Sequence, residues 1–239
     1  MKFHMFPHSR LFVAISLCIY LLNDISVKAE ESIREERRKK VPVEKLILNL
    51  EKPEKIERKK PDKVIELLGV KEGEAIADIG AGTGLFSFRL ADKVGPAGKV
   101  YAVEIEDALL DFITEKKKRN NISNVITIRS SDSSPNLPPN SCDKLLIVTT
   151  LEYLSNPVQF MRLALNSLKP EGLVGVVFID KAKIKVNTSS TRHFFRQDEV
   201  IEIMKQAGFQ FHESHEIFTN MCFFVFKQAT TGVRTGSDQ

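Results

Sequence analysis

The sequence predicts an α/β fold in which helices cover both faces of a mainly parallel sheet. Three observations in the 239-residue chain lead to this prediction. Short apolar runs alternate with amphipathic stretches of about ten residues or more, a glycine-rich turn follows the first run, and no helical stretch separates the last two runs. Such alternation is typical of parallel strands with crossover helices, whereas directly joined strands run antiparallel. The last strand is therefore expected to be antiparallel.

The first half of the domain begins with a helix over 61–69, which opens on a proline and ends on a glycine. The apolar run Ala75–Ile79 has the length and composition of a buried strand. The amphipathic stretch 85–94 predicts a helix, because a Gly-Pro pair ends it. The next elements are a strand over 100–103, a helix over 106–119 and a strand over 125–128.

The second half continues the pattern with a strand over 144–148 and a helix over 156–168, which a Lys-Pro-Glu-Gly turn ends. A fifth strand is expected over 173–179, and a helix over 198–207 stops at a glycine. The last two strands are expected over 209–217 and 221–226, with a tight connection between them.

The first thirty residues resemble a targeting segment. Basic residues precede an apolar run at 11–22, and Val27 and Ala29 place small side chains before a cleavage point at Glu30. The run is shorter than the roughly 17–25 residues that span a bilayer. Residues 1–29 are therefore expected to be a cleaved signal peptide that exports the chain, and a membrane anchor formed by the apolar run is the alternative.

Charge is distributed unevenly along the chain. The formal net charge of +4 resides in residues 28–63, whereas residues 64–239 are nearly neutral. A nucleic-acid-binding domain would carry its basic excess on the fold itself, so no nucleic-acid partner is expected. Residues 30–60 are interpreted as a charged helical arm or linker, either solvated or gripping an anionic surface. The domain is expected at 61–228, followed by a polar tail at 229–239.

The turn after the first strand carries three alternating glycines, Gly80, Gly82 and Gly84. Glycine permits positive φ and a close approach of ligand atoms, at the sheet edge where such folds bind ligands. A dinucleotide fingerprint requires G-x-G-x-x-G, but Leu85 stands where its third glycine would be. Asp78 also occupies a strand position that is usually apolar in dinucleotide folds. An NAD-dependent oxidoreductase is therefore the weaker alternative.

The segment Asp78-Ile-Gly80-Ala-Gly82-Thr-Gly84 resembles the first motif of class I S-adenosylmethionine-dependent methyltransferases. The resemblance extends from about Asn49 to Lys227. The further segments that carry it are Tyr101-Ala-Val-Glu104, Ser131-Asp132, Leu137-Pro-Pro-Asn-Ser-Cys-Asp143-Lys-Leu-Leu-Ile, Leu168-Lys-Pro-Glu-Gly-Leu173 and Gln206-Ala-Gly-Phe209. The resemblance implies a Rossmann-like three-layer sandwich with a seven-stranded sheet.

The resemblance also implies S-adenosylmethionine as the cofactor and assigns residues to it. Asp78 would orient the glycine turn or receive the ammonium, and the three glycines would leave room for the methionine half. Glu104 would accept both ribose hydroxyls, and Asp132 would lie beside the adenine ring. Other interpretations are a helix cap for Asp78, a surface acid for Glu104 and a turn-forming residue for Asp132. No metal-ligand pattern is present in the sequence.

The segments after the fourth and fifth strands resemble the branch that contains quinone and other small-molecule methyltransferases. The implied reaction is in-line transfer of a methyl group to a small-molecule or lipid-like acceptor (class EC 2.1.1.-). Glu152, Tyr153 and His193 are the candidates to face the acceptor, although Tyr153 could be a core residue and His193 an ordinary loop histidine. A catalytically degenerate cofactor-binding protein of the same fold is the other alternative. Membrane association through the N-terminal segment is a further expectation.

Overall fold

The computed structural model of the chain describes residues 42–184, 193–218 and 220–229. The chain divides into two compact units, 1–46 and 47–239, and only residues 42–46 of the first are described. The predicted leader at 1–29 and residues 230–239 of the predicted tail lie outside the described residues. Among the described residues, no helix combines the length and apolar character that crossing a lipid bilayer requires.

Helices and strands alternate along the chain as the sequence predicts. The helices are α2 (Val43–Leu50), α3 (Pro53–Lys59), α4 (Pro61–Leu67), α5 (Leu85–Val94), α6 (Asp107–Arg119), α7 (Pro157–Leu165) and α8 (Gln197–Gln206), with short 3-10 turns η1 (Leu151–Tyr153) and η2 (Lys181–Lys183). The strands are β1 (Ala75–Ile79), β2 (Lys99–Glu104), β3 (Val125–Arg129), β4 (Cys142–Val148), β5 (Leu168–Ile179), β6 (Phe209–Phe218) and β7 (Met221–Gln228).

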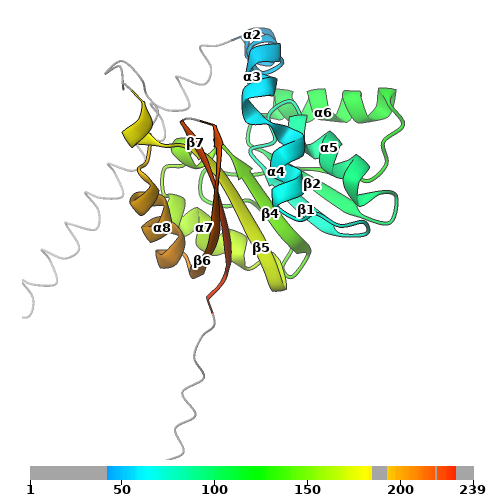
Figure 1. Cartoon of the computed structure of the whole chain (residues 1–239). Helices are drawn as coiled ribbons and strands as arrows, with labels where there is room; N and C mark the ends of the chain where they lie inside the picture. Colours follow the sequence, from blue (N-terminus) through cyan, green and yellow to red (C-terminus); the bar gives the residue numbers. More distant parts are fainter. Residues whose placement is uncertain (1–41, 185–192, 219, 230–239) are drawn as a thin grey trace, which may run out of the picture. The chain divides into compact units, whose positions relative to one another are not determined.

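The seven strands form a single sheet in the order β3-β2-β1-β4-β5-β7-β6 (Figure 1). The pairs from β3 to β5 are all parallel, and β7 runs antiparallel to both of its neighbours, β5 and β6. The predicted seven-stranded, mainly parallel sheet with an antiparallel last strand is confirmed. The last strand of the chain is inserted next to β5 and is not at the edge of the sheet.

Two apolar layers hold the helices on the sheet. On one face, α4, α5 and α6 bury side chains such as Val64, Leu90 and Ile113 against the strands. On the other face, α7 and α8 bury side chains such as Phe160 and Met204. Figure 1 shows these two helical layers on opposite faces of the sheet. The three-layer sandwich is therefore the observed architecture.

The region between α7 and β5 differs from its predicted form. The helix ends at Leu165, not at residue 168, and β5 starts at Leu168. The reason is backbone pairing, since the N–H groups of Ser141 and Cys142 both donate to the carbonyl of Ser167 at 2.9 Å. Glu171 has a left-handed φ of 63°, and the pairing of β4 with β5 shifts register there. The Lys-Pro-Glu-Gly segment is therefore an irregular start of β5.

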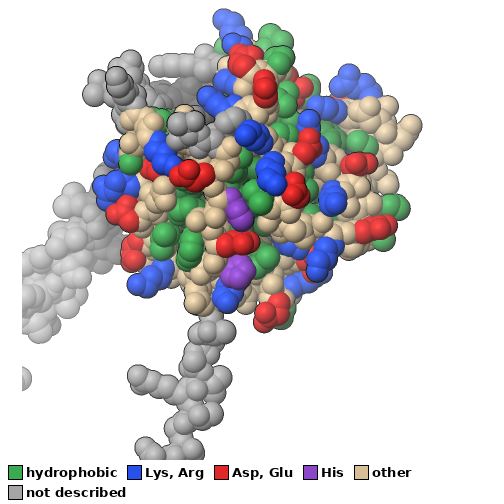
Figure 2. Space-filling view, viewed as in Figure 1, with side chains coloured by type: hydrophobic (Ala, Val, Ile, Leu, Met, Phe, Trp, Pro, Cys, Tyr) green, Lys and Arg blue, Asp and Glu red, His purple; other side chains and the backbone are tan. Residues whose placement is uncertain are grey.

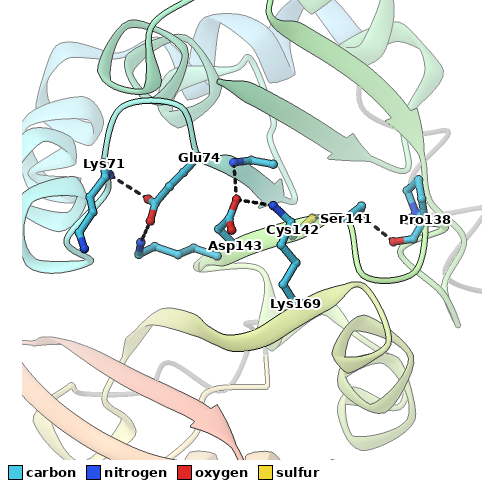
Figure 3. Close-up of polar contacts among 9 residues, drawn as sticks. Lys71, Glu74, Pro138, Ser141, Cys142, Asp143 and Lys169 are labelled. Atoms are coloured by element: carbon cyan, nitrogen blue, oxygen red, sulfur yellow. Dashed lines mark hydrogen bonds and ion pairs between the residues drawn. The ribbon is translucent and has the colours of Figure 1, made fainter. Parts of the chain in front are cut away.

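The amino-terminal edge of the sheet contains a network of paired charges (Figure 3). The Lys144 ammonium pairs with Glu74, and their side chains are 8% and 17% exposed. Asp143 accepts hydrogen bonds from the Ala75 N–H and the Lys169 ammonium, both at 2.8 Å. Burial alone would raise the pKa of Asp143, but these hydrogen bonds hold that pKa below its usual range. The network ties the first residues of β1, β4 and β5 together.

The visible surface carries charges of both signs. On the face shown in Figure 2, Lys and Arg side chains are interspersed with Asp and Glu side chains. A nucleic-acid-binding surface would gather its basic side chains into one patch or stripe. This face has no such patch among the described residues.

The buried pair of Lys144 and Glu74 leads to a stability prediction. Lys144→Met removes the ammonium that pairs with Glu74 and leaves a largely buried carboxylate without its cationic partner. The free energy of unfolding should therefore fall by about 3 kcal/mol. Urea unfolding measures this loss. The double variant Glu74→Gln/Lys144→Met should recover much of it, because no unpaired charge remains. As a control, Lys63→Met breaks an exposed pair with Glu66 and should change stability by less than about 0.5 kcal/mol. Equal losses for Lys144→Met and Lys63→Met would contradict the prediction.

Candidate functional site

The candidate site lies at the carboxyl edge of the sheet, opposite the charge network. β1 is the central switch point, because β2 and β3 continue the sheet to one side of it and β4 and β5 to the other. Ligands of open α/β sheets bind at such a switch point. The register aligns Ile79 with Val103 of β2 and with Ile147 of β4, so the segments after these three strands emerge together.

The glycine turn after β1 requires glycine for two separate reasons. Gly80, Gly82 and Gly84 have φ values of 77°, 58° and 79°, in the left-handed region that side chains rarely adopt. At Gly80 a Cβ atom would also lie 2.2 Å from Oγ1 of Thr150, which follows β4. The N–H of Gly80 donates to the Val103 carbonyl at 2.8 Å. The turn is therefore held between the ends of β2 and β4.

Glu104, the last residue of β2, also accepts a hydrogen bond from the turn. Its Oε2 accepts the Gly82 N–H at 2.8 Å, and its Oε1 accepts the N–H groups of Ile105 at 2.7 Å and Glu106 at 3.3 Å. The side chain is buried. A carboxylate offers about four acceptor positions, and three are used here. Both hydroxyls of a ribose can therefore be accepted only if the long bond from Glu106 is given up.

Asp78, in β1, is one of the most deeply buried acids of the site. Its Oδ2 accepts the Ser87 hydroxyl of α5 at 2.6 Å, and the side chain is 2% exposed. Burial raises the pKa of Asp78 to about 6, although the Ser87 hydroxyl and the charge of Lys59 lower it. A cationic ligand group beside Asp78 would stabilise its ionised form.

Asp132 lies at the same edge, three residues beyond the end of β3. It belongs to a serine-rich bend in which the Ser131 hydroxyl accepts the Ser134 N–H at 3.0 Å. The Asn136 side-chain amide donates to the Arg129 carbonyl at 2.9 Å and closes the bend. The neighbours of Asp132 therefore form the hydrogen bonds of a turn.

Two of the three candidates for the acceptor side, Glu152 and Tyr153, follow Thr150, whose side chain lies beside Gly80. Glu152 is buried in η1, and its Oε1 accepts the Ile179 N–H at 3.3 Å. The His193 N–H donates to the Glu152 carbonyl at 3.4 Å, so the structure brings these two residues together. The Tyr153 side chain is 48% exposed, and it is not a core residue.

Sequence reasoning missed three polar residues of this edge. The Ser87 hydroxyl donates to Asp78, as described above. The Thr150 side chain lies beside Gly80. Asp180 follows β5 and is 2% exposed, with its carboxylate accepting the Ala182 N–H at 3.0 Å and the Gln197 amide at 2.8 Å. A polar residue on the otherwise apolar face of α5 was the available signal for Ser87. Thr149 has a left-handed φ of 52°, which is strained for a β-branched residue.

The buried acids share one location. Among the described residues, the acidic side chains that are less than 9% exposed are Asp78, Glu104, Glu152 and Asp180. They stand at the carboxyl ends of β1, β2, β4 and β5, whereas the buried lysine, Lys144, stands at the opposite edge. Buried carboxylates gathered at one edge suit a cationic ligand group. Among the described residues, no group of acids, histidines and cysteines could hold a metal ion.

A separate hollow of about 410 Å³ lies between α4 and α5, lined by residues such as Asp62, Ile65 and Arg89. None of Asp78, the three glycines or Glu104 lines it. This hollow is therefore not the ligand site described above.

Comparisons with known proteins found a matching family model and several relatives. The family model described as methyltransferase domain matches residues 70–219. The chain is 28% identical over 118 residues to a ubiquinone/menaquinone biosynthesis C-methyltransferase UbiE of Pasteurella multocida, covering 49% of this chain and 44% of the relative. It is 30% identical over 117 residues to a demethylmenaquinone methyltransferase of Lactobacillus johnsonii, covering 48% of each. The chain thus spans about half the length of the curated relatives it matches.

A solved structure gives a longer match. The crystal structure of a SAM-dependent methyltransferase from Aquifex aeolicus superposes with a TM-score of 0.70 at 25% identity. The match covers 78% of this chain and 98% of that one. The fold is therefore shared with that structure over most of the chain.

The buried state of Asp78 leads to a pH prediction. Its folded pKa of about 6 lies above the ordinary value of 3.8, so ionisation destabilises the fold as the pH rises through this window. Asp78→Asn removes that penalty. At pH 7.5 the ligand-free variant should be more stable than the parent chain by up to about 3 kcal/mol, and the difference should vanish near pH 4. Urea unfolding at the two pH values measures it. A variant that is less stable by the same amount at both pH values would exclude this interpretation.

Proposed function

The chain belongs to the methyltransferase-domain family, and from this premise we propose that it transfers a methyl group from S-adenosylmethionine to a small, lipid-like acceptor. The observation that carries the proposal is the acidic carboxyl edge around the glycine turn. When bound, the cofactor supplies an electrophilic methyl group on a positively charged sulfonium. Asp78 would receive its ammonium, Glu104 would accept a ribose hydroxyl, and the glycine turn would admit the methionine chain between them.

Asp132 extends this assignment to the adenine end. It follows β3, the neighbour of β2, so it lies on the side of Glu104 away from β1. A ribose held at Glu104 would direct its base toward this bend. The order Asp78, Glu104, Asp132 across the sheet then follows the order of ammonium, ribose and base in the ligand.

Glu152, Tyr153 and His193 are proposed to contact the acceptor. Glu152 and Tyr153 follow β4, and His193 follows β5. Both strands lie on the side of β1 opposite β2. In-line transfer depends on holding the nucleophile against the methyl group and on excluding water. The buried Glu152 carboxylate could orient an acceptor hydroxyl or take its proton, while Tyr153 offers an exposed aromatic surface.

The acceptor class is proposed to be a quinol or a related aromatic lipid. Two relatives are named for methylation in ubiquinone or menaquinone biosynthesis, and the segments after β4 and β5 resemble that branch. An aromatic ring that bears a hydroxyl would suit an exposed aromatic side chain, Tyr153, next to the carboxylate-bearing residue Glu152 in the sequence. Turnover of a short-chain demethylmenaquinol, followed by mass spectrometry, tests the class, and cofactor binding without any turnover would favour the degenerate alternative.

Calorimetric titration of S-adenosylmethionine and S-adenosylhomocysteine into the full chain tests the cofactor site. Saturable binding of both ligands is expected. Glu104→Ala should weaken it by roughly 10–150-fold, because the ribose loses a charged hydrogen bond worth ~1.5–3 kcal/mol and the Gly82 N–H loses its acceptor.

The matched control is Glu115→Ala, which removes an exposed acid of α6 and should leave binding unchanged. Folded protein that binds neither ligand would reject the proposal. Binding of a nicotinamide dinucleotide in their place would support the oxidoreductase alternative.

We also propose that residues 1–29 export the chain, with anchoring through 11–22 as the alternative. Support comes from the sequence alone, in the order of basic residues, apolar run and small residues before Glu30. Fractionation of cells that express the full chain, with N-terminal sequencing, should find a product that starts at Glu30 in the exported fraction. Full-length protein in the membrane fraction would establish the anchor. Full-length protein in the cytosol would reject both.

A further inference from the structure

Strand β6 forms one edge of the sheet. Its inner side pairs with β7, and no strand of the described residues pairs with its outer side. The outer side of such a strand presents backbone N–H and C=O groups to which another strand can bind. Natural proteins block many sheet edges with charged side chains or with irregularities of the strand. The sequence of β6 therefore decides whether this edge is closed or can pair.

The regular part of β6 is the run Glu213–Glu216. Each residue of this run has one partner in β7, whereas the register shifts on both sides of the run. Just beyond it, the Ile217 carbonyl accepts the Lys60 ammonium at 3.1 Å. The stretch of edge that another strand can use is therefore short and lies around this run.

His215 lies within the run and has a nitrogen that can still take a partner. Its ring stacks on that of Phe223 in β7, with the ring centres 5.9 Å apart. Its Nε2 atom is buried, and no group of the described residues is hydrogen-bonded to it. The Glu213 Oε2 atom is 3.6 Å from this nitrogen, which is too long for a hydrogen bond. A second carboxylate could therefore bind here.

The order of residues in this part of β6 is self-complementary. The segment His212-Glu-Ser-His-Glu216 is unchanged when it is read backwards and histidine and glutamate are exchanged. Two identical strands that pair antiparallel about a twofold axis must place a residue opposite its own copy. The reason is that N–H and C=O groups alternate in direction along a strand, and opposing residues must point the same way.

An axis through Ser214 sets residues of the two different types against each other at the flanking positions. His215 then opposes Glu213 of the second copy, and His212 opposes Glu216. Opposing side chains have Cβ atoms about 4.5–5.5 Å apart, so the carboxylates are within reach of the rings. A histidine N–H donates to a carboxylate whether the ring is neutral or charged. An axis through Glu213, His215 or Glu216 would instead set that residue against its own copy.

We propose that two copies of this chain associate through β6, which pairs antiparallel with its copy about an axis at Ser214. The sheets of both copies then form one continuous sheet. The Ser214 side chain is small and exposed, so the two strands can approach closely at the axis. β7, β5 and β4 separate β6 from β1, so the pairing leaves the glycine turn open. This inference goes beyond the proposed function and does not depend on it.

The test changes the charge of this edge in two opposite ways. Glu213→Lys/Glu216→Lys gives a basic edge, and His212→Glu/His215→Glu gives an acidic edge. Analytical ultracentrifugation should find a dimer for the full parent chain. Each variant alone should raise the dimer dissociation constant at least about 10-fold, because the opposite pairs are lost and like groups oppose each other.

An equimolar mixture of the two variants should form a 1:1 heterodimer. Each basic residue of one variant then opposes a glutamate of the other. Both double variants lose the contact between residues 213 and 215 within their own chain. Recovery in the mixture can therefore come only from contacts between copies.

Asp111→Lys/Glu115→Lys is the matched control. It makes the same change in charge with two exposed acids of α6, which packs on β2 and β3 far from β6, and it should leave the dimer intact. A monomeric parent chain, a dimer that survives in both edge variants, or a mixture that stays monomeric would each overturn the inference. A thermal melt of each variant checks folding. The single variants Glu213→Lys and His215→Glu, mixed in the same way, replace a double variant that does not fold.

Discussion

The hydrogen bonds between the end of β2 and the glycine turn are the constraint on which the site depends. The Val103 carbonyl and the Glu104 carboxylate accept N–H groups of the turn and hold it across the edge of the sheet. The turn can adopt its left-handed path only because glycine stands at the three positions. Thr150 closes the other side, at a distance that leaves no room for a side chain on Gly80. Residues at the ends of β2 and β4 thus hold the glycine turn that follows β1.

The two edges of the sheet treat charge in opposite ways. At the amino edge, Glu74 and Asp143 each have a lysine partner, and the charges stabilise the strand starts. At the carboxyl edge, Asp78 is kept buried with a pKa of about 6, which costs stability at neutral pH. Such an arrangement is typical of binding sites, because a ligand of opposite charge recovers the cost. The edge that the ion pairs stabilise and the edge that carries the candidate site are thus opposite ends of the same strands.

The sequence predicted the fold well, because alternating apolar runs and helical stretches are local signals. β1 and α5 have the bounds that the sequence predicted, and the antiparallel β7 follows from the missing helix before it. The predicted start of β5 was wrong, because the pairing of this strand with β4 determines where it begins, and local sequence does not reveal that pairing. Asp78 and Glu104 could be selected from motifs, but Asp180 could not. Its significance depends on a contact with a distant segment, the hydrogen bond that it accepts from Gln197 of α8.

The position of β7 has a consequence for how the molecule is made. β7 lies between β5 and β6 and supplies backbone partners to both, although it is the last strand in the chain. During synthesis the strands from β1 to β5 can pair as they emerge, whereas β6 has no partner until residues 221–228 have left the ribosome. Completion of the sheet is therefore a late, long-range event that waits for the final strand. Until then, β5 presents an open edge of the kind that chaperones recognise.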